Sequence, residues 1–215
     1  MKETELVFIL DKSGSMAGLE SDTIGGFNSM LSKQKALDGK CRITTVLFDN
    51  HYELLHDRID IRAVSPMTER EYQVGGSTAL LDAIGRTIQK LISVQRNTAE
   101  EYRADSVMFV IITDGVENAS REYSAQKVKT MIEHEREEYG WEFVFLGANI
   151  DAVETAGRFG IAPDRAVDYV PDGAGTELNF QMMSEAVAAF RETRVMPQAP
   201  LEAIRKDMKK RGWRR

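Results

Sequence analysis

The chain opens its first apolar run with Leu6-Val7-Phe8-Ile9-Leu10 and continues at once into Asp11-Lys12-Ser13-Gly14-Ser15-Met16. Five consecutive apolar residues bounded by a turn predict a parallel strand that is buried on both faces. Beyond its carboxyl end, such a strand presents Asp11, Ser13 and Ser15 at alternate positions. Open α/β sheets bind ligands at that edge, where the strand order reverses. The stretch therefore predicts a doubly wound domain with a ligand site after its first strand.

The rest of the chain alternates between apolar runs and helical patterns. Further strands are expected over 42–49, 51–61, 106–113, 142–147 and 166–170, and helices over 19–37, 78–94, 122–139, 152–159 and 177–194. Strands that alternate with helices specify a mostly parallel sheet with helices on both faces. The two-residue connection Asp49-Asn50 fits only an antiparallel hairpin, which places 51–61 at an edge. We expect a Rossmann-like doubly wound α/β fold, with a mostly parallel six-stranded sheet and one antiparallel edge strand.

Two later segments bring more oxygen ligands to the same edge. Thr78 opens an apolar-periodic helix after Gly75-Gly76-Ser77, and Asp114 follows the expected strand 106–113. Carboxylate and hydroxyl oxygens, with no Cys or His beside them, suit a hard Mg²⁺-like ion better than zinc. The candidate metal ligands are Asp11, Ser13, Ser15, Thr78 and Asp114.

The order and context of these five residues resemble the von Willebrand factor A domain family and its metal-ion-dependent adhesion site. The shared pattern is Asp-x-Ser-x-Ser, a distant Thr and a distant Asp, and the resemblance covers about residues 1–194. It implies a stand-alone intracellular domain with an intact site that holds Mg²⁺, with Mn²⁺ and Ca²⁺ as alternatives. It also implies that the serines bind the metal directly, that the carboxylates often hold bound waters, and that an Asp or Glu of a protein partner fills the open coordination position.

Each of the five residues also has an ordinary structural interpretation. Asp and Ser after a strand are common turn and N-cap residues. Thr78 alone would fit the N-cap of the helix that it opens, and Asp114 alone would fit a turn before Gly115. The five together, at two strand ends and one helix start, favour the metal site. Nearby polar residues, among them Glu117 and Asn118, are interpreted as loop or capping residues.

The pattern favours a binding module over an enzyme. The alternative is a metal-dependent phosphatase or hydrolase on a doubly wound fold, but an aspartyl-phosphate phosphatase would carry a second acid where Ser13 stands. A serine nucleophile would need a Gly-x-Ser-x-Gly turn or a positioned histidine, and the scattered His51, His56 and His134 are interpreted as solvated or edge residues. The first turn also lacks Gly-x-Gly-x-x-Gly, which disfavours dinucleotide binding. No catalytic residue and no organic cofactor are expected.

Composition and length are those of an ordinary globular chain. The 215 residues are 42% hydrophobic, which fits one domain with a sizeable core. The single cysteine, Cys41, excludes an intramolecular disulfide and leaves no cysteine cluster for structural zinc. No signal peptide or membrane-length apolar run is visible. We therefore expect a cytoplasmic protein that does not associate with membranes.

The net charge of −6 hides a basic C-terminal tail. Residues 195–215 carry seven basic and two acidic side chains, a net of +5, which leaves −11 for the domain at 1–194 and argues against nucleic-acid binding by that domain. After Pro197 and Pro200, the spacing of Leu201, Ile204 and Met208 predicts a short basic amphipathic helix. The favoured interpretation is that this helix packs on the acidic body. The alternative is a separate docking element for an acidic partner surface or nucleic acid, with Trp213 as an anchor.

Overall fold

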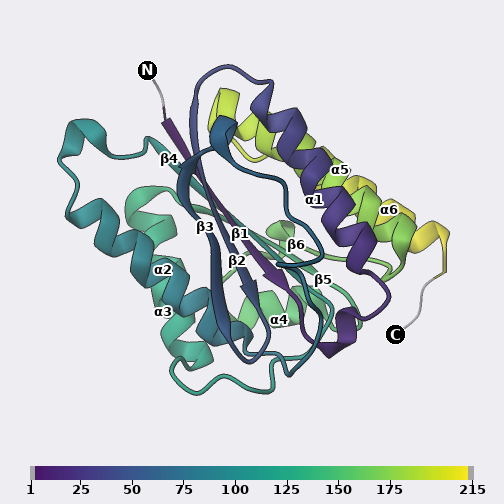
Figure 1. The fold of residues 1–215 in the computed structure, drawn as a ribbon. Helices are drawn as coiled ribbons and strands as arrows, with labels where there is room; N and C mark the ends of the chain where they lie inside the picture. Colours follow the sequence, from purple (N-terminus) through teal and green to yellow (C-terminus); the bar gives the residue numbers. More distant parts are fainter. Residues whose placement is uncertain (1–2, 213–215) are drawn as a thin grey trace.

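Six strands form one sheet in the order β3-β2-β1-β4-β5-β6 in the computed structural model, which describes residues 3–212 (Figure 1). The strands are β1 (Glu3–Asp11), β2 (Lys40–Phe48), β3 (Tyr52–Asp60), β4 (Ser106–Thr113), β5 (Glu142–Gly147) and β6 (Ala166–Asp168). All neighbouring strands pair in parallel except β3, which runs antiparallel to β2 at the edge. The predicted mostly parallel sheet with one antiparallel edge strand is confirmed.

Helices cover both faces of the sheet (Figure 1). They are α1 (Glu20–Lys35), α2 (Leu80–Arg96), α3 (Ala125–Tyr139), α4 (Ala152–Arg158), α5 (Gly173–Thr193) and α6 (Ala199–Lys210). Short 3₁₀ turns lie at Gly14–Met16, Ile61–Ala63, Glu100–Tyr102 and Pro163–Arg165. Within residues 3–212, no helix is both long and apolar enough to cross a membrane.

Strand β1 separates two hydrophobic cores. Because successive side chains of a strand point to opposite faces, Phe8 enters the core under α1, α5 and α6, whereas Ile9 enters the core under α2, α3 and α4. Both side chains are fully buried. The continuous apolar run at the start of the chain is therefore explained by burial on both sides of the sheet.

Helix α5 begins four residues before the predicted Glu177, because its start is set by a cap and not by the apolar stripe. Asp172 accepts a hydrogen bond from the backbone N–H of Gly175 at 2.8 Å, as an N-cap residue does. A side chain on Gly175 would place its Cβ 2.0 Å from the carbonyl oxygen of Val170. The glycine-rich residues 173–176, whose composition suggests a loop, therefore form the tightly packed first turn of α5.

Helix α6 packs against the body of the protein. Pro200, Leu201 and Ile204 are buried, and the last two belong to the same core as α1 and α5. A terminal guanidinium nitrogen of Arg205 also donates to the carbonyl oxygen of Ala166 in β6 at 2.9 Å. The structure therefore shows the packed arrangement of the basic helix, while Trp213 lies outside the described residues.

His56 is an edge residue as expected, since it lies on the edge strand β3, but its ring is buried and not solvated. Its Nδ1 is 3.0 Å from the hydroxyl of Thr45, and its ring stacks on Phe27 with centroids 6.4 Å apart. Burial is the main reason why the pKa of His56 is lowered from its ordinary value.

We expect part of the acid sensitivity of folding to come from His56. Because its pKa is lower in the folded state, the unfolded chain binds the proton more readily, and stability should fall as pH drops below about 6.5. His56→Gln should remove that part of the loss when urea unfolding is compared at about pH 7.5 and about pH 5.5. The same loss of stability in His56→Gln and in the wild type over this pH range would contradict the assignment.

Candidate functional site

The predicted ligands meet at the carboxyl ends of β1 and β4. These two strands are neighbours at the centre of the sheet, and Leu10 pairs with Ile112, so Asp11 and Asp114 leave the sheet side by side. The strand order reverses direction between β1 and β4, and such a switch point leaves a crevice between the connections. The structure brings all five predicted residues together at this crevice.

Backbone contacts hold the loop before α2 against the turn after β1. The N–H of Gly14 donates to the carbonyl oxygen of Gly76 at 3.1 Å, and the N–H of Gly75 donates to the carbonyl oxygen of Lys12 at 2.9 Å. Gly76 has φ +74°, and a Cβ there would lie 2.1 Å from Oδ1 of Asn50. Only glycine fits both conditions, so the Gly75-Gly76 pair is what delivers Thr78 to the site.

Four of the side chains form a chain of oxygen contacts. The hydroxyl of Thr78 donates to Oγ of Ser13 at 3.0 Å, and the hydroxyls of Ser13 and Ser15 are 3.1 Å apart. Ser15 in turn donates to Oδ1 of Asp114 at 2.5 Å. Adjacent oxygens around an octahedral Mg²⁺, with bonds of 2.0–2.1 Å, are about 3 Å apart. The separations of the three hydroxyl oxygens therefore fit neighbouring corners of such a coordination shell.

Gly115 keeps the space beside these hydroxyls open. A Cβ at this position would lie 3.0 Å from Oγ of Ser15, 3.0 Å from Oγ1 of Thr78 and 3.8 Å from Oγ of Ser13. Any side chain here would fill the volume that the three oxygens share. The glycine thus preserves a small, oxygen-lined cradle.

The two carboxylates are buried close together without a basic partner. Asp11 and Asp114 are both almost inaccessible to solvent, and within residues 3–212 neither forms an ion pair with Lys or Arg. Burial raises the pKa of Asp114 to about 6, an effect that its hydrogen bond from Ser15 opposes and the charge of Asp11 reinforces. Burial also raises the pKa of Asp11, against the hydrogen bonds that it accepts. Two buried like charges are stabilised by a bound cation, so the electrostatics also fit a metal ion.

The donor set limits which metal the site suits. Among residues 3–212, no three Asp, Glu, His or Cys side chains gather closely enough to bind a metal by themselves. The candidate site depends instead on three hydroxyls and two carboxylates, which are hard ligands. This composition favours Mg²⁺ or a similar ion.

Comparison with known proteins shows which fold the chain has. No family model and no curated protein sequence matches the chain. Among solved structures, a von Willebrand factor type A protein from Catenulispora acidiphila superposes with a TM-score of 0.59 at 14% identity, over 87% of this chain and 43% of that one. The chain has the von Willebrand factor A fold.

Two further structures extend this likeness. Proximal thread matrix protein 1 from the mussel byssus, in a form with a zinc-occupied MIDAS motif, gives a TM-score of 0.61 at 10% identity, over 87% of this chain and 48% of that one. The ArnB paralog VWA2 from Sulfolobus acidocaldarius gives a TM-score of 0.53 at 15% identity, over 87% of this chain and 45% of that one. The chain thus spans less than half the length of all three proteins. At such identities the likeness establishes the von Willebrand factor A fold alone.

Three residues that support the site in this von Willebrand factor A fold were missed in the sequence. The hydroxyl of Thr113 donates to Oδ2 of Asp11 at 2.5 Å, and the hydroxyl of Tyr72 donates to the backbone carbonyl of Asp11. Gly115 forms the cradle. The position of Thr113 at the end of β4, opposite Asp11, is a signal that the register of two adjacent strands could have supplied. Tyr72 lies in a loop, and no pattern in the sequence points to it.

The residues after Asp114 are capping residues, as expected. Glu117 accepts from the backbone N–H of Leu81 in the first turn of α2 at 2.8 Å, and Oδ1 of Asn118 accepts from the N–H of Thr78 at 2.9 Å. The side chain of Thr78 does not cap the helix, because the N-cap position is Ala79 and the Thr78 hydroxyl bonds to Ser13. These contacts leave Thr78 free to present its oxygen to the cradle.

Gly115→Ala should weaken metal binding and leave the fold intact. The new methyl group would stand within contact distance of two hydroxyl oxygens, so the ion and the side chain would compete for one space. We expect a loss of affinity for Mg²⁺ of at least about tenfold by isothermal titration calorimetry, which corresponds to about 1.4 kcal/mol. Gly25→Ala, where a Cβ meets nothing within 4 Å, is the control and should bind as the wild type does.

Proposed function

We propose that this chain is a metal-dependent protein-interaction module of the von Willebrand factor A family. In this proposal Mg²⁺ binds at Asp11, Ser13, Ser15, Thr78 and Asp114, and an Asp or Glu of a partner protein completes its coordination. The observation that carries it is the set of hydroxyl oxygens 3.0 and 3.1 Å apart beside two buried, unneutralised carboxylates. The zinc-occupied MIDAS motif of the mussel protein supports a divalent ion in a protein of this fold.

The charge of the ligands explains why a partner carboxylate would be attracted. Three of the five side chains are neutral hydroxyls, so an ion that they contact keeps much of its positive charge for a further ligand. Ser15 is exposed to solvent, which leaves a side from which that ligand can approach. A partner carboxylate would then form a charge-assisted contact at the centre of an interface.

A polar hollow beside the site offers room for the rest of the partner. It has a volume of about 760 Å³ and is lined by residues of the β2–β3 turn, the start of α2 and the loop after β4, including His51, Arg86 and Arg121. Together with residues 16–22, 67–77 and 115–121, which flank the ligands, this hollow would supply the surrounding contacts. The hollow is lined by charged and amide groups of both signs, and Arg86 is already paired there with Glu122, so a partner segment would meet a polar surface around the metal.

The proposal is tested by selecting peptides whose binding to the protein depends on the metal. A peptide library displayed on phage is panned on the protein in Mg²⁺, and the bound phage are eluted with EDTA. We expect the eluted peptides to share an Asp or Glu whose change to Asn or Gln abolishes binding, and we expect no recovery on the Asp114→Ala variant. Peptides that bind equally in EDTA, or that tolerate loss of every acidic residue, would refute a metal-bridged mechanism.

We also propose that the site binds and does not catalyse. The hydroxyls of Ser13, Ser15 and Thr78 bond to one another and to Asp114, and no histidine of the described residues contacts them. The alternative, a metal-dependent phosphatase or hydrolase, is tested with chromogenic phosphate and carboxylic esters in Mg²⁺ and Mn²⁺. Turnover that is lost on Ser15→Ala or Asp11→Ala would establish the enzyme instead.

A further inference from the structure

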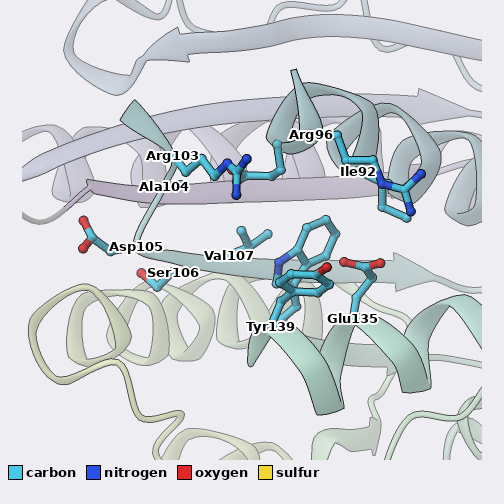
Figure 2. A pocket seen from close by; sticks show the side chains of 11 residues that line it. Ile92, Arg96, Arg103, Ala104, Asp105, Ser106, Val107, Glu135 and Tyr139 are labelled. Carbon is cyan, nitrogen blue, oxygen red and sulfur yellow. The ribbon is translucent and has the colours of Figure 1, made fainter. Parts of the chain in front are cut away.

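A second cavity lies at the opposite end of the sheet from the metal site. It has a volume of about 350 Å³ and opens between α2, α3 and the start of β4 (Figure 2). Strand β4 has eight residues, so the two ends of this strand are about 23 Å apart. The cavity is therefore separate from the metal site, and it lies on the face of the sheet that α2 and α3 cover.

One wall of the cavity holds a buried carboxylate without a close partner. The side chain of Glu135 is 4% exposed, and Nε2 of His134 lies 3.9 Å from one of its carboxylate oxygens. No hydrogen bond to the Glu135 carboxylate is formed within residues 3–212. Burial raises the pKa of Glu135, while His134 and Arg96 lower it. A largely buried carboxylate that accepts no hydrogen bond beside a cavity points to a ligand that would satisfy it.

The facing wall holds two guanidinium groups. Figure 2 shows Arg96 and Arg103 across the cavity from Glu135. Nε of Arg103 donates to the carbonyl oxygen of Thr98 at 2.9 Å, and neither arginine forms an ion pair within the described part of the chain. The other acid at the rim, Asp105, is already paired with Arg194 at 2.8 Å. The two guanidinium groups are therefore available to an anion, for which their planar fork is well suited.

The surface between the two charged walls is apolar. Trp141 and Val107 are buried there, and the indole of Trp141 is fixed by stacking on Phe109 with centroids 5.7 Å apart. Ile92 completes this surface from α2. A ligand that crosses the cavity would thus lay a hydrocarbon segment over a rigid floor, with a charge at each end.

We propose that this cavity binds a zwitterionic small molecule of the basic amino-acid class, which carries an amine or guanidine at one end and a carboxylate at the other. The cationic end pairs with Glu135, and the carboxylate lies between Arg96 and Arg103. A volume of about 350 Å³ is at the small end of the range for small-molecule sites, which suits a ligand of this size.

The test uses L-arginine as the probe in isothermal titration calorimetry. We expect one saturable site, weakened at least about tenfold by Glu135→Gln and by Arg103→Gln, because each change removes one of the two charge-assisted contacts. Agmatine, which lacks the carboxylate, and L-citrulline, which carries a neutral ureido group in place of the guanidinium, should each bind more weakly than L-arginine. Glu138→Gln, at an exposed position of α3, and Arg70→Gln, an exposed arginine away from the cavity, are the controls and should bind as the wild type does.

Thermal unfolding separates a binding role of Glu135 from a structural one. Since Glu135→Gln removes a buried charge that accepts no hydrogen bond, the variant should melt at the same temperature as the wild type or higher, and it should keep its affinity for Mg²⁺. A clearly lower melting temperature would show that the carboxylate has a structural partner and would overturn the argument. So would the absence of saturable L-arginine binding up to about 10 mM, or binding that neither variant changes. Binding of guanosine monophosphate with the same dependence on both residues, in place of L-arginine, would assign the cavity to nucleotides and refute the class proposed.

Discussion

Asp114→Ala should abolish measurable Mg²⁺ binding and at the same time raise the stability of the metal-free protein. The carboxylate is a proposed ligand, so its removal should lower metal affinity by at least about 100-fold. In the absence of metal, the same carboxylate is a buried charge beside Asp11, and burial has already raised its pKa to about 6. Removing it relieves a repulsion, so the two measured effects have opposite signs.

The measurement is best made above the pKa of Asp114. At about pH 7.5 the carboxylate is ionised, and protons do not compete with the metal for it. Calorimetry gives the affinity, and thermal unfolding with and without Mg²⁺ gives the stabilisation by the ion. Asp11→Ala should likewise lose metal affinity, but without the gain in stability, because it also removes the acceptor of the Thr113 hydroxyl. Glu69→Ala, an exposed acid in the flanking loop, should change neither quantity. Unchanged metal affinity in both aspartate variants would refute the assignment of the site.

The fold could be predicted because the patterns that specify it are local. The apolar run before Asp11, the hairpin at Asp49-Asn50 and the periodic stripe of α2 each depend on neighbouring residues only. Their alternation leaves few topologies open, since parallel crossovers in one sheet have a single hand. The same reasoning places Asp11 and Asp114 at one edge without knowledge of any side-chain contact.

What could not be predicted depends on packing between distant segments. Tyr72 reaches the backbone of Asp11 from a loop, and the cradle of Gly115 exists only because three hydroxyls from other segments surround it. Glu135 belongs to a helix whose sequence is largely charged, so nothing in the pattern distinguishes its buried carboxylate from its solvated neighbours. His56 is similar, because its burial follows from the packing of Phe27 against the edge strand. Such residues need tertiary structure before their chemistry is visible.

Leu201→Ala should destabilise the protein by about 2–5 kcal/mol, because the leucine side chain is completely buried. Its truncation reduces the apolar surface that is buried on folding and also leaves a cavity. Ile204→Ala should cost a similar amount, and the two effects should couple since the residues lie one helical turn apart. Urea unfolding at fixed Mg²⁺ measures both. Changing Lys206, Lys209 and Lys210 together to Ala is the matched control on the exposed side of α6, and it should leave stability within about 0.5 kcal/mol.

These variants, together with a deletion of α6, distinguish a helix that packs into the core from one that docks a partner. If α6 is part of the core, deleting residues 199–215 should lower the melting temperature strongly and leave binding of selected peptides, measured well below that temperature, unchanged. If the helix is instead a docking element, the triple lysine variant should lose binding to an acidic partner or nucleic acid, and that binding should weaken steeply with salt. The burial of Leu201 and Ile204, together with the hydrogen bond from Arg205 to Ala166, favours the first outcome. A Leu201→Ala variant as stable as the wild type would contradict it, because a leucine that is packed into a core cannot be truncated without cost.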